Sequence, residues 1–555
     1  MPYQNYPSRL FGDLRKMLRA SVKQFGDKTL FLQKKEGVYR KISYKRYYED
    51  VCALGTELLA RGLGGKRILV IGENSYPWVT AYMAVICGVG VVVPVDRELS
   101  SERISDLAHR CDAAAVIHSA SVAKKLTGLD DSIVRIGFGE LGRLAGCGQE
   151  RMARGDRSYL DAVIDPAALS ALIFTSGTTG DTKGVMLSHR NLCFNLYQMC
   201  KMIYIGSDDI FLSVLPLHHC YETTCGFLCP LYRGASVAFA DGLRRLMQDM
   251  QAVRPTVMLC VPMLPETIHQ KIYEGIRRYG MEAEVQSAIR MTNALYPASV
   301  RMSTKKKVFS AMHQSFGGRL RLLISGGAPL DPSVTAGLRD FGFQVLQGYG
   351  LTECAPIAAL NRDTFSNDAS VGMATPDTLL DVCDIQDDGI GEIRFRGENV
   401  MLGYYGMPDE TSRVLRDGWF YTGDLGYLDE KGFLFIVGRK KNMIVTADGK
   451  NIFPEELEGL LDHSRFVKES LVVGKKNDKA QTVELVAVLH PDYEALRERY
   501  GESFTDSQLD LEMNRAVTGT NAQLPPYKRI DSFSVSPTPF PKNTSRKIIR
   551  EAVVL

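Results

Sequence analysis

Residues 172–189 read LIFTSGTTGDTKGVMLSH, and the interpretation of the whole chain starts from this stretch. The apolar run that ends at Phe174 predicts a buried strand, and the loop after it is rich in glycine and hydroxyl side chains. Glycine lets backbone N–H groups turn toward an anion, while hydroxyls and a lysine ammonium add further donors. The loop therefore suits a polyphosphate, although its spacing is not that of a Walker A motif and a flexible surface loop is the alternative. The candidate phosphate-binding residues are Thr175, Ser176, Gly177, Thr178, Thr179, Gly180 and Lys183.

Apolar runs that alternate with helix-like stretches extend outward from this loop in both directions. Strand-like runs occur at 68–72, 91–95, 114–118, 236–240, 256–260 and 320–325. Strands that are apolar without a break and are separated by helices are typical of parallel sheets covered on both faces. We therefore predict an α/β fold, with a large N-terminal domain of parallel-rich sheets covered by helices.

The pattern of apolar runs and turns changes after about residue 375. Short strand-like runs at 391–397 and 432–438 are separated by Gly and Asp turns, which predicts a small antiparallel or barrel-like subdomain. A charged stretch, GRKKN, follows at 438–442, and the remaining residues mix short strands with helices. We predict an N-terminal domain at 1–438, a connection at 439–442 and a small α+β domain at 443–555.

The composition is that of a globular protein and excludes several classes. The chain has 555 residues, of which 45% are apolar, and its 67 Lys and Arg nearly balance its 64 Asp and Glu. Dedicated nucleic-acid binders usually carry a basic excess, so no nucleic-acid partner is expected at a net charge of +3. The 12 cysteines lack paired spacing, and the N-terminus lacks the apolar core of a secretory signal, which together favour a cytoplasmic location.

Four further segments place polar residues where a strand or turn ends. They are PLHHCYE at 216–222, SGGAP at 325–329, QGYGLTE at 347–353 and YTGD at 421–424. Proteins of the α/β class bind ligands at such positions. Each segment alone is weak support for a site, because a glycine-rich turn is as often structural.

Two other patterns are open to a chemical interpretation. GFGELG at 137–142 fits the GxGxxG of a nicotinamide-dependent oxidoreductase, but no clear strand ending in an acidic residue follows about twenty residues later, so we interpret it as a turn. Cys220, Cys225 and Cys229 lie beside two histidines, but their spacing fits no standard zinc site. We interpret these cysteines as small buried residues that line an apolar pocket. A nucleotide-binding module without catalysis is a further alternative.

Taken together and in this order, these segments resemble the adenylate-forming superfamily of acyl-CoA synthetases, luciferases and peptide-synthetase adenylation domains. The similarity runs from about residue 10 to residue 550 and includes the phosphate loop, QGYGLTE, YTGD, GRKKN and the C-terminal lysine motif FPKNTSRKIIR at 540–550. The resemblance implies a two-step reaction. A carboxylate attacks the α-phosphate of ATP in the presence of Mg²⁺, giving acyl-AMP and pyrophosphate. The thiol of coenzyme A then displaces AMP and forms a thioester.

The resemblance also implies roles for individual residues. Glu353 binds Mg²⁺, with Thr178 as a second metal contact, and Thr352 contacts the α-phosphate. His219, in preference to His218, borders the acyl carboxylate.

The C-terminal part carries the rest of the implied machinery. Lys547 matches the lysine that bridges the carboxylate and the α-phosphate, where it stabilises developing charge. Lys441 falls at a hinge about which the C-terminal domain rotates between the half-reactions, and the loop with Gly449 then lines the thiol channel. The residues implied at the adenine and ribose are Gly326, Gly327, Ala328, Gly348, Tyr349, Gly350 and Asp424, and Arg439 is implied at the ribose or the phosphate.

The identity of the acid rests on the segment between Leu264 and Arg321. This long, helical-looking segment resembles that of long-chain fatty acyl-CoA synthetases, which implies a fatty acid of medium to long chain. An aromatic acid, or a separate acyl carrier protein in place of coenzyme A, remains an alternative. Residues 266–318 carry eight Lys or Arg and four Glu, which suits either a surface that meets anionic membrane lipid or a solvated helical face.

Overall fold

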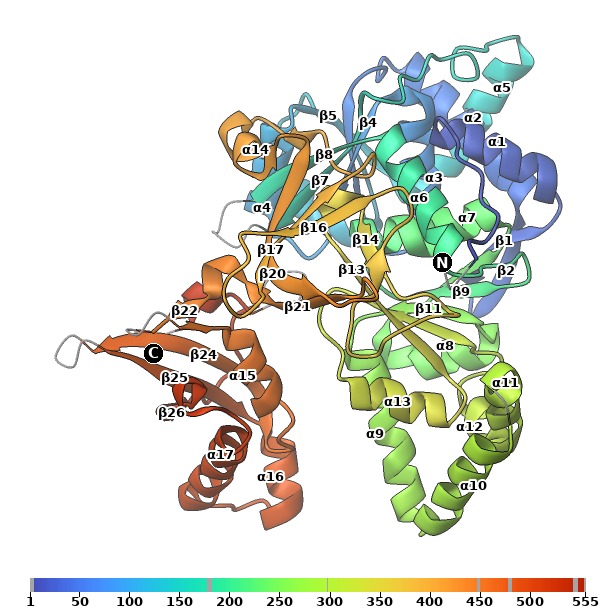
Figure 1. Cartoon of the computed structure of the whole chain (residues 1–555). Helices are drawn as coiled ribbons and strands as arrows, with labels where there is room; N and C mark the ends of the chain where they lie inside the picture. Colours follow the sequence, from blue (N-terminus) through green and yellow to red (C-terminus); the bar gives the residue numbers. More distant parts are fainter. Residues whose placement is uncertain are drawn as a thin grey trace.

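The computed structural model describes residues 4–176, 182–296, 298–446, 450–477, 482–542 and 548–553. These residues form the mixed α/β fold that the sequence predicts, with large sheets covered by helices (Figure 1). Within them, no helix is both long enough and apolar enough to cross a lipid bilayer.

The phosphate-loop strand lies near one edge of a seven-stranded sheet. It runs parallel to the four strands on its inner side, whereas β8 and β18 are antiparallel to the strands beside them. The order across the described sheet is β18 (Gly403–Tyr404), β8 (Thr182–Ser188), β7 (Leu169–Ser176), β4 (Val91–Val95), β3 (Arg67–Ile71), β5 (Ala113–His118) and β6 (Val134–Gly137).

A second, nine-stranded sheet carries the segments 216–222, 325–329 and 347–353 at or after the ends of its strands. Its middle strands are parallel, and β2, β14 and β15 add antiparallel edges. The described order is β15 (Met373–Ala374), β14 (Ile357–Leu360), β13 (Gln344–Gly350), β12 (Leu322–Ser325), β11 (Val257–Cys260), β9 (Ile210–Ser213), β10 (Ser236–Phe239), β1 (Thr29–Lys35) and β2 (Val38–Ser43).

Alternate residues of each inner strand enter different cores, which explains the unbroken apolar runs. Ile68 and Val70 of β3 belong to the core shared by the two sheets, whereas Leu69 and Ile71 pack in a core with α4 (Ser101–Arg110). Helices in the shared core are α1 (Leu14–Phe25), α2 (Tyr44–Ala60), α3 (Tyr76–Ala84), α6 (His189–Met202) and α7 (Cys229–Arg233). The outer face of the nine-stranded sheet is covered by α8 (Leu246–Val253), α9 (Met263–Arg278), α10 (Glu282–Leu295), α12 (Ser310–Ser315) and α13 (Pro332–Asp340), with α11 (Ala298–Val308) beside α10 and α12.

The residues after 375 build smaller units. An antiparallel sheet contains β16 (Leu379–Cys383), β17 (Gly391–Arg396), β20 (Trp419–Leu428), β19 (Leu415–Arg416) and β21 (Leu434–Arg439), with α14 (Pro408–Val414) between β18 and β19. The C-terminal part contains β22 (Ile444–Val445), β23 (Asn451–Ile452), α15 (Pro454–Leu461), β24 (Val467–Asn477), β25 (Thr482–Pro491), α16 (Tyr493–Tyr500), α17 (Asp506–Asn521) and β26 (Ser532–Val535). Figure 1 shows these elements as a separate lobe at the lower left. The lobe has hydrophobic cores of its own, around Leu457, Leu485 and Met513 and around Phe540. The exact domain boundary at 438–442 stays a prediction.

The GxGxxG segment is a turn between β6 and α5 (Leu141–Ala153). The backbone N–H of Gly137 donates to Glu140 Oε1 at 2.9 Å. This N–H is therefore already hydrogen-bonded to a side chain of the same turn. On α5, Gly148 packs directly against α2, because a Cβ there would lie 1.8 Å from the Ala53 carbonyl oxygen. A Cβ on Gly146 of the same helix would meet open space.

We predict that Gly148→Ala lowers the free energy of unfolding by about 1–3 kcal/mol, since the new methyl group forces α5 away from α2. Thermal denaturation measures the change. Gly146→Ala is the matched control and should raise stability by about 0.5–1 kcal/mol, because alanine costs less backbone entropy than glycine in a helix. Equal melting temperatures for the two variants would contradict the packing argument.

Candidate active site

The phosphate loop is flanked by β7 and β8, which pair antiparallel. Thr175 of β7 pairs with Lys183 of β8, and the Thr175 hydroxyl donates to the Lys183 carbonyl at 3.4 Å. The Lys183 ammonium forms an ion pair with Glu410 Oε2 at 2.7 Å and lies 4.9 Å from the centre of the Tyr404 ring. The hydrogen bond from Lys183 lowers the pKa of Glu410. Gly177, Thr178, Thr179 and Gly180 lie outside the described residues.

Glu353 lies in a 3₁₀ turn, Thr352–Cys354, directly after β13. Its Oε1 accepts a hydrogen bond from the Tyr404 hydroxyl at 2.8 Å, and its carbonyl accepts from the Met401 N–H at 2.8 Å. Burial and the charge of Glu353 together raise the pKa of Tyr404. Tyr404 therefore contacts both Lys183 and Glu353, and it joins the phosphate loop to the predicted metal ligand.

The donor set at Glu353 fits Mg²⁺ held partly by substrate. Among the described residues, no group of three or more His, Cys, Asp or Glu side chains is placed to hold a metal ion. Mg²⁺ usually binds nucleotide enzymes through one or two carboxylates plus phosphate oxygens and water, so a single hard carboxylate is sufficient. Glu353 meets that requirement, whereas the three cysteines near His219 do not suit this ion.

Residues predicted to contact the ribose lie together where β13 meets β20. Tyr349 donates a short hydrogen bond to Asp424 Oδ2, and Arg439 Nε lies 2.6 Å from Asp424 Oδ1. Burial, then the charge of Asp424, raises the pKa of Tyr349 well above its usual value, so this hydroxyl stays a donor. Gly348 and Gly350 permit close pairing here; a Cβ on Gly350 would lie 2.1 Å from the Pro356 carbonyl.

The segment after β12 forms the neighbouring wall. Gly326 is buried, and a Cβ there would lie 3.3 Å from the Tyr221 ring, whose hydroxyl donates to the Ile324 carbonyl at 2.9 Å. Gly327 has a φ of +86°, a left-handed conformation that favours glycine, and Ala328 beside it is exposed.

The histidine motif packs against these segments. The His218 and His219 rings lie 4.1 Å apart, and His218 Nε2 is 3.7 Å from Asp96 Oδ2. Burial lowers the pKa of His218 well below its usual value, so its ring is neutral at pH 7. Burial raises the pKa of Cys220 to about 12, with a further contribution from the charge of Glu353, which lies nearby.

An apolar cavity of about 20 Å³ lies behind the histidine motif, which is about the space that one water molecule needs. Cys225 and Cys229 line it, while Cys220 is buried beside it; their place in an acyl pocket stays a prediction. Ile324 joins the cavity to the wall that contains Gly326, and Ile205 forms part of its lining after α6.

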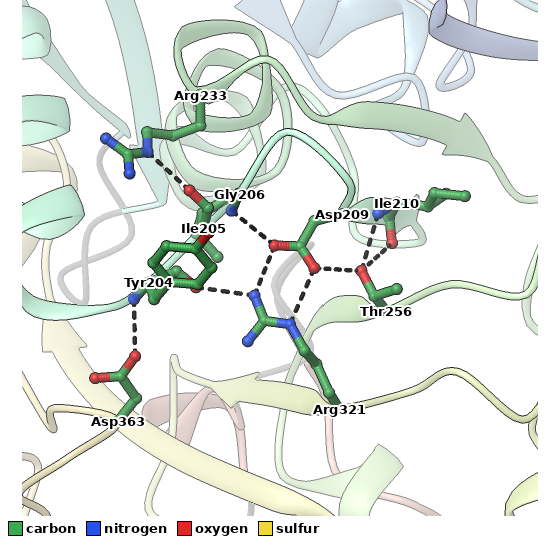
Figure 2. A network of polar contacts seen from close by, with 9 residues as sticks. All are labelled: Tyr204, Ile205, Gly206, Asp209, Ile210, Arg233, Thr256, Arg321 and Asp363. Atoms are coloured by element: carbon green, nitrogen blue, oxygen red, sulfur yellow. Dashed lines mark hydrogen bonds and ion pairs between the residues drawn. The ribbon is translucent and has the colours of Figure 1, made fainter. Parts of the chain in front are cut away.

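The segment that carries Ile205 is held by a polar network (Figure 2). The Asp209 carboxylate accepts from Arg321 Nε and Nη2 at 2.9 and 2.6 Å and from the Thr256 hydroxyl at 2.7 Å. Arg321 also donates to the Tyr204 carbonyl at 2.8 Å. Burial would raise the pKa of Asp209, but the hydrogen bonds and charge of Arg321 lower it overall. The cavity wall is therefore fixed by an ion pair whose carboxylate is buried and whose guanidinium is partly exposed.

The C-terminal residues are described in part. Lys547 and Gly449 lie outside the described residues. The 3₁₀ turn Lys440–Asn442 changes partners along its length: Lys440 pairs with Glu392 of β17 at 2.7 Å, whereas Asn442 donates to Glu455 of α15 at 2.6 Å. Between them, Lys441 lies 3.8 Å from Glu551.

Sequence reasoning missed Tyr404 and Glu410. Both lie in GYYGMPDE at 403–410, which reads as a turn followed by the start of a helix. The Lys183–Glu410 pair joins residues 227 positions apart, and no local pattern marks such a contact. The acidic residues that follow Pro408 were the one available signal.

Residues 18–405 match the model of the AMP-binding enzyme family. The chain is 28% identical to long-chain-fatty-acid–CoA ligase 1 of Homo sapiens, over 92% of this chain and 79% of the ligase. It is 30% identical to long-chain-fatty-acid–CoA ligase 5 of Rattus norvegicus, over 90% of this chain and 80% of that ligase.

Solved structures share the fold over nearly the whole chain. ATP-bound MatB from Rhodopseudomonas palustris has a TM-score of 0.74 at 25% identity and covers 97% of both chains. O-succinylbenzoate coenzyme A synthetase from Bacillus subtilis, solved with ATP and a magnesium ion, has a TM-score of 0.71 at 20% identity, over 96% of this chain and 98% of that chain.

We predict that Glu410→Gln tightens ATP binding, because a triphosphate no longer competes with this carboxylate for Lys183. The pair is partly exposed, so the dissociation constant should fall by only about two- to fivefold. Isothermal titration calorimetry measures it. Arg413→Gln is the control, since it removes the other partner of Glu410 and leaves the Lys183 pair intact. Equal tightening in both variants would contradict the assignment.

Proposed function

The chain belongs to the AMP-binding enzyme family, and on that basis we propose that it activates a medium- to long-chain fatty acid with ATP and transfers the acyl group to coenzyme A. AMP-forming acid–CoA ligase chemistry is supported by the family match and by the names of the relatives. The observation that supports the fatty substrate is the wholly apolar character of the side chains behind the histidine motif, which include Cys225 and Cys229 and reach Ile357, just after the Glu353 turn. The relatives' names add support at 28% and 30% identity.

The first step replaces a very poor leaving group. A carboxylate cannot release oxide, so its oxygen attacks the α-phosphorus of ATP, and the bond to pyrophosphate breaks. Lys183 and its loop would hold the β- and γ-phosphates, and Asp424 would accept hydrogen bonds from the ribose. Mg²⁺, held by Glu353, with Thr178 as a further proposed contact, supplies positive charge against the triphosphate. Lys547 would stabilise charge at the α-phosphate.

The second step breaks the acyl–phosphate bond. The sulfur of coenzyme A attacks the acyl carbon, AMP leaves, and a thioester forms. We propose that residues 443–555 rotate about 439–442 between the steps, with Lys441 at the pivot and the loop containing Gly449 near the thiol. The change of partners from Glu392 to Glu455 across this turn supports the pivot.

Pyrophosphate release across a series of saturated and aromatic acids, with ATP and Mg²⁺, tests the activity and its substrate. We expect release with fatty acids of medium to long chain and little with benzoate. Competition between coenzyme A and a purified acyl carrier protein then identifies the acceptor. If none of the acids in the series gave pyrophosphate, the proposal would be refuted. A preference for benzoate or for the carrier protein would establish the corresponding alternative.

Lys547→Ala should slow acyl-adenylate formation by about 10²–10³, as expected when one donor to the transition state is lost. Thioester formation from preformed acyl-AMP should be spared. The two half-reactions are measured separately by pyrophosphate release and by thioester yield. Lys542→Ala is the matched control: it lies in the same segment, but its ammonium pairs with Glu469 at 2.5 Å. Equal loss in both half-reactions would argue against the role.

We also propose that the α9–α10 turn contacts anionic membrane lipid. The three lysines at 305–307 are not a common exposed surface: Lys305 is buried and pairs with Asp340 at 2.8 Å, and Lys306 donates to the Leu320 carbonyl at 3.2 Å. The exposed basic residues of this lobe include Arg277 and Arg278 at the end of α9, at the lower edge of Figure 1. Tyr279, 76% exposed, follows them and offers an aromatic side chain to the interface.

Arg277→Glu combined with Arg278→Glu should weaken binding to vesicles that contain phosphatidylglycerol by roughly tenfold or more, since each basic residue near such a surface contributes ~1 kcal/mol. Vesicle co-sedimentation measures binding. Lys23→Glu with Lys45→Glu makes the same change of charge on exposed residues of α1 and α2 and should have little effect. Unchanged binding in the arginine variant would remove the proposed surface.

A further inference from the structure

Glu222 is a buried carboxyl group that the proposed chemistry does not use. It is the last residue of the histidine motif, 216–222, and its side chain is 1% exposed. It is also the first residue of a π-helix, Glu222–Leu228, a rare form of helix that is frequent at functional sites. Its Oε1 accepts from the Ser213 hydroxyl at 2.5 Å, while its Oε2 has no partner among the described residues. Gly226, one turn along, leaves room for the carboxyl, since a Cβ there would lie 2.7 Å from it.

A chain of hydrogen bonds leads from Glu222 to the loop that carries the histidines. The Ser213 hydroxyl, at the end of β9, accepts from Asn74 Nδ2 at 2.9 Å. Asn74 also donates to the Leu215 carbonyl at 2.6 Å and accepts from the Leu217 N–H at 3.0 Å. Asn74 follows β3 of the seven-stranded sheet. These hydrogen bonds therefore connect the two sheets through residues 214–219.

The same loop is fixed from its other end. The His219 N–H donates to the Pro216 carbonyl at 3.1 Å, and the Thr223 hydroxyl donates to the His219 carbonyl at 3.2 Å. The position of the imidazoles therefore depends on the Glu222–Ser213–Asn74 chain on one side and on the first turn of the π-helix on the other.

Glu222 is neutral in this environment. Burial raises its pKa from 4.5 to about 8, and the hydrogen bond from Ser213 opposes that rise. The titratable groups that sense its charge are Tyr221 and Cys225 on its own element, and burial keeps both neutral. From β9 it faces the uncharged Ser213, and no described lysine, arginine or histidine forms an ion pair with it. Ionisation would leave an uncompensated buried charge, which costs several kcal/mol unless the loop opens to water.

We propose that Glu222, as an uncharged carboxylic acid, is a positioning residue that acts through Ser213 and Asn74 to hold the histidine loop in place for the incoming carboxylate. The inference rests on the proposed function for what His219 faces, but not for the hydrogen-bond chain itself. Loss of the proton above pH 8 then disorders the loop and weakens use of the acid.

Glu222→Gln is the decisive variant, because it keeps an oxygen that can accept from Ser213 and cannot ionise. With dodecanoate, ATP and Mg²⁺, its kcat/KM for the acid should stay within about twofold of wild type at pH 7. The wild type should lose roughly fivefold between pH 8 and pH 9, as the protonated fraction of a group with a pKa of about 8 falls, relative to a flat ratio in Glu222→Gln. Equal pH profiles, or a Glu222→Gln enzyme as poor as Glu222→Ala, would overturn the proposal.

Ser213→Ala breaks the chain without touching Glu222 and should lower kcat/KM for the acid with little change in KM for ATP. Thermal unfolding gives a readout that needs no substrate. The folded carboxyl binds its proton up to about pH 8 and the unfolded one only to about 4.5, so wild-type stability should fall relative to Glu222→Gln as pH rises through that window. A constant difference between the two would overturn the neutral state of Glu222. Failure of every acid to release pyrophosphate would refute only the proposed function.

Discussion

Two buried amide side chains hold the turn that carries Glu353, and the geometry of the site depends on them. Asn195 of α6 donates to the Ile357 carbonyl at 2.6 Å and to the Cys354 carbonyl at 3.3 Å, and it accepts from the Ile357 N–H at 3.2 Å. Asn399 donates to the same two carbonyls at 3.3 Å each. Because α6 begins directly after β8, Asn195 fixes Glu353 relative to the phosphate loop. Loss of one such amide leaves buried carbonyls unsatisfied, at about 1–3 kcal/mol each.

The charges of the site are already paired within the chain. Lys183 contacts Glu410, and Arg439 contacts Asp424, so neither cation is held in a low dielectric without a partner. A nucleotide that enters therefore exchanges one anionic partner for another and does not have to supply the whole cost of desolvation. At Lys183 such exchange favours a polyphosphate over a singly charged anion, since a polyphosphate brings more negative charge than the Glu410 carboxylate that it displaces.

Those parts of the fold and of the candidate site whose residues are adjacent in the sequence could be predicted from it. The apolar strands and the motifs at their ends could be predicted, because burial on both faces and glycine-rich turns leave a local pattern; the same holds for Tyr349 and Asp424. Tyr404 and Lys305 could not be predicted. Tyr404 acts through a contact across the sheet edge, and the charge run around Lys305 does not show which side of α11 faces Asp340. Protonation of Glu222 likewise depends on burial by distant segments.

The contrast between buried amides and exposed ion pairs bears on the proposed motion. His463 of the C-terminal part lies 2.8 Å from Asp331, and both side chains are partly exposed. Lys441 and Glu551, at 3.8 Å, are also partly exposed. Exposed pairs of this kind contribute about 0–1 kcal/mol each, far less than the buried contacts that fix Glu353. A nucleotide site built on buried hydrogen bonds can stay rigid while a neighbour with its own core changes position at little cost, and this difference in bond type supports one fixed site that serves two successive reactions.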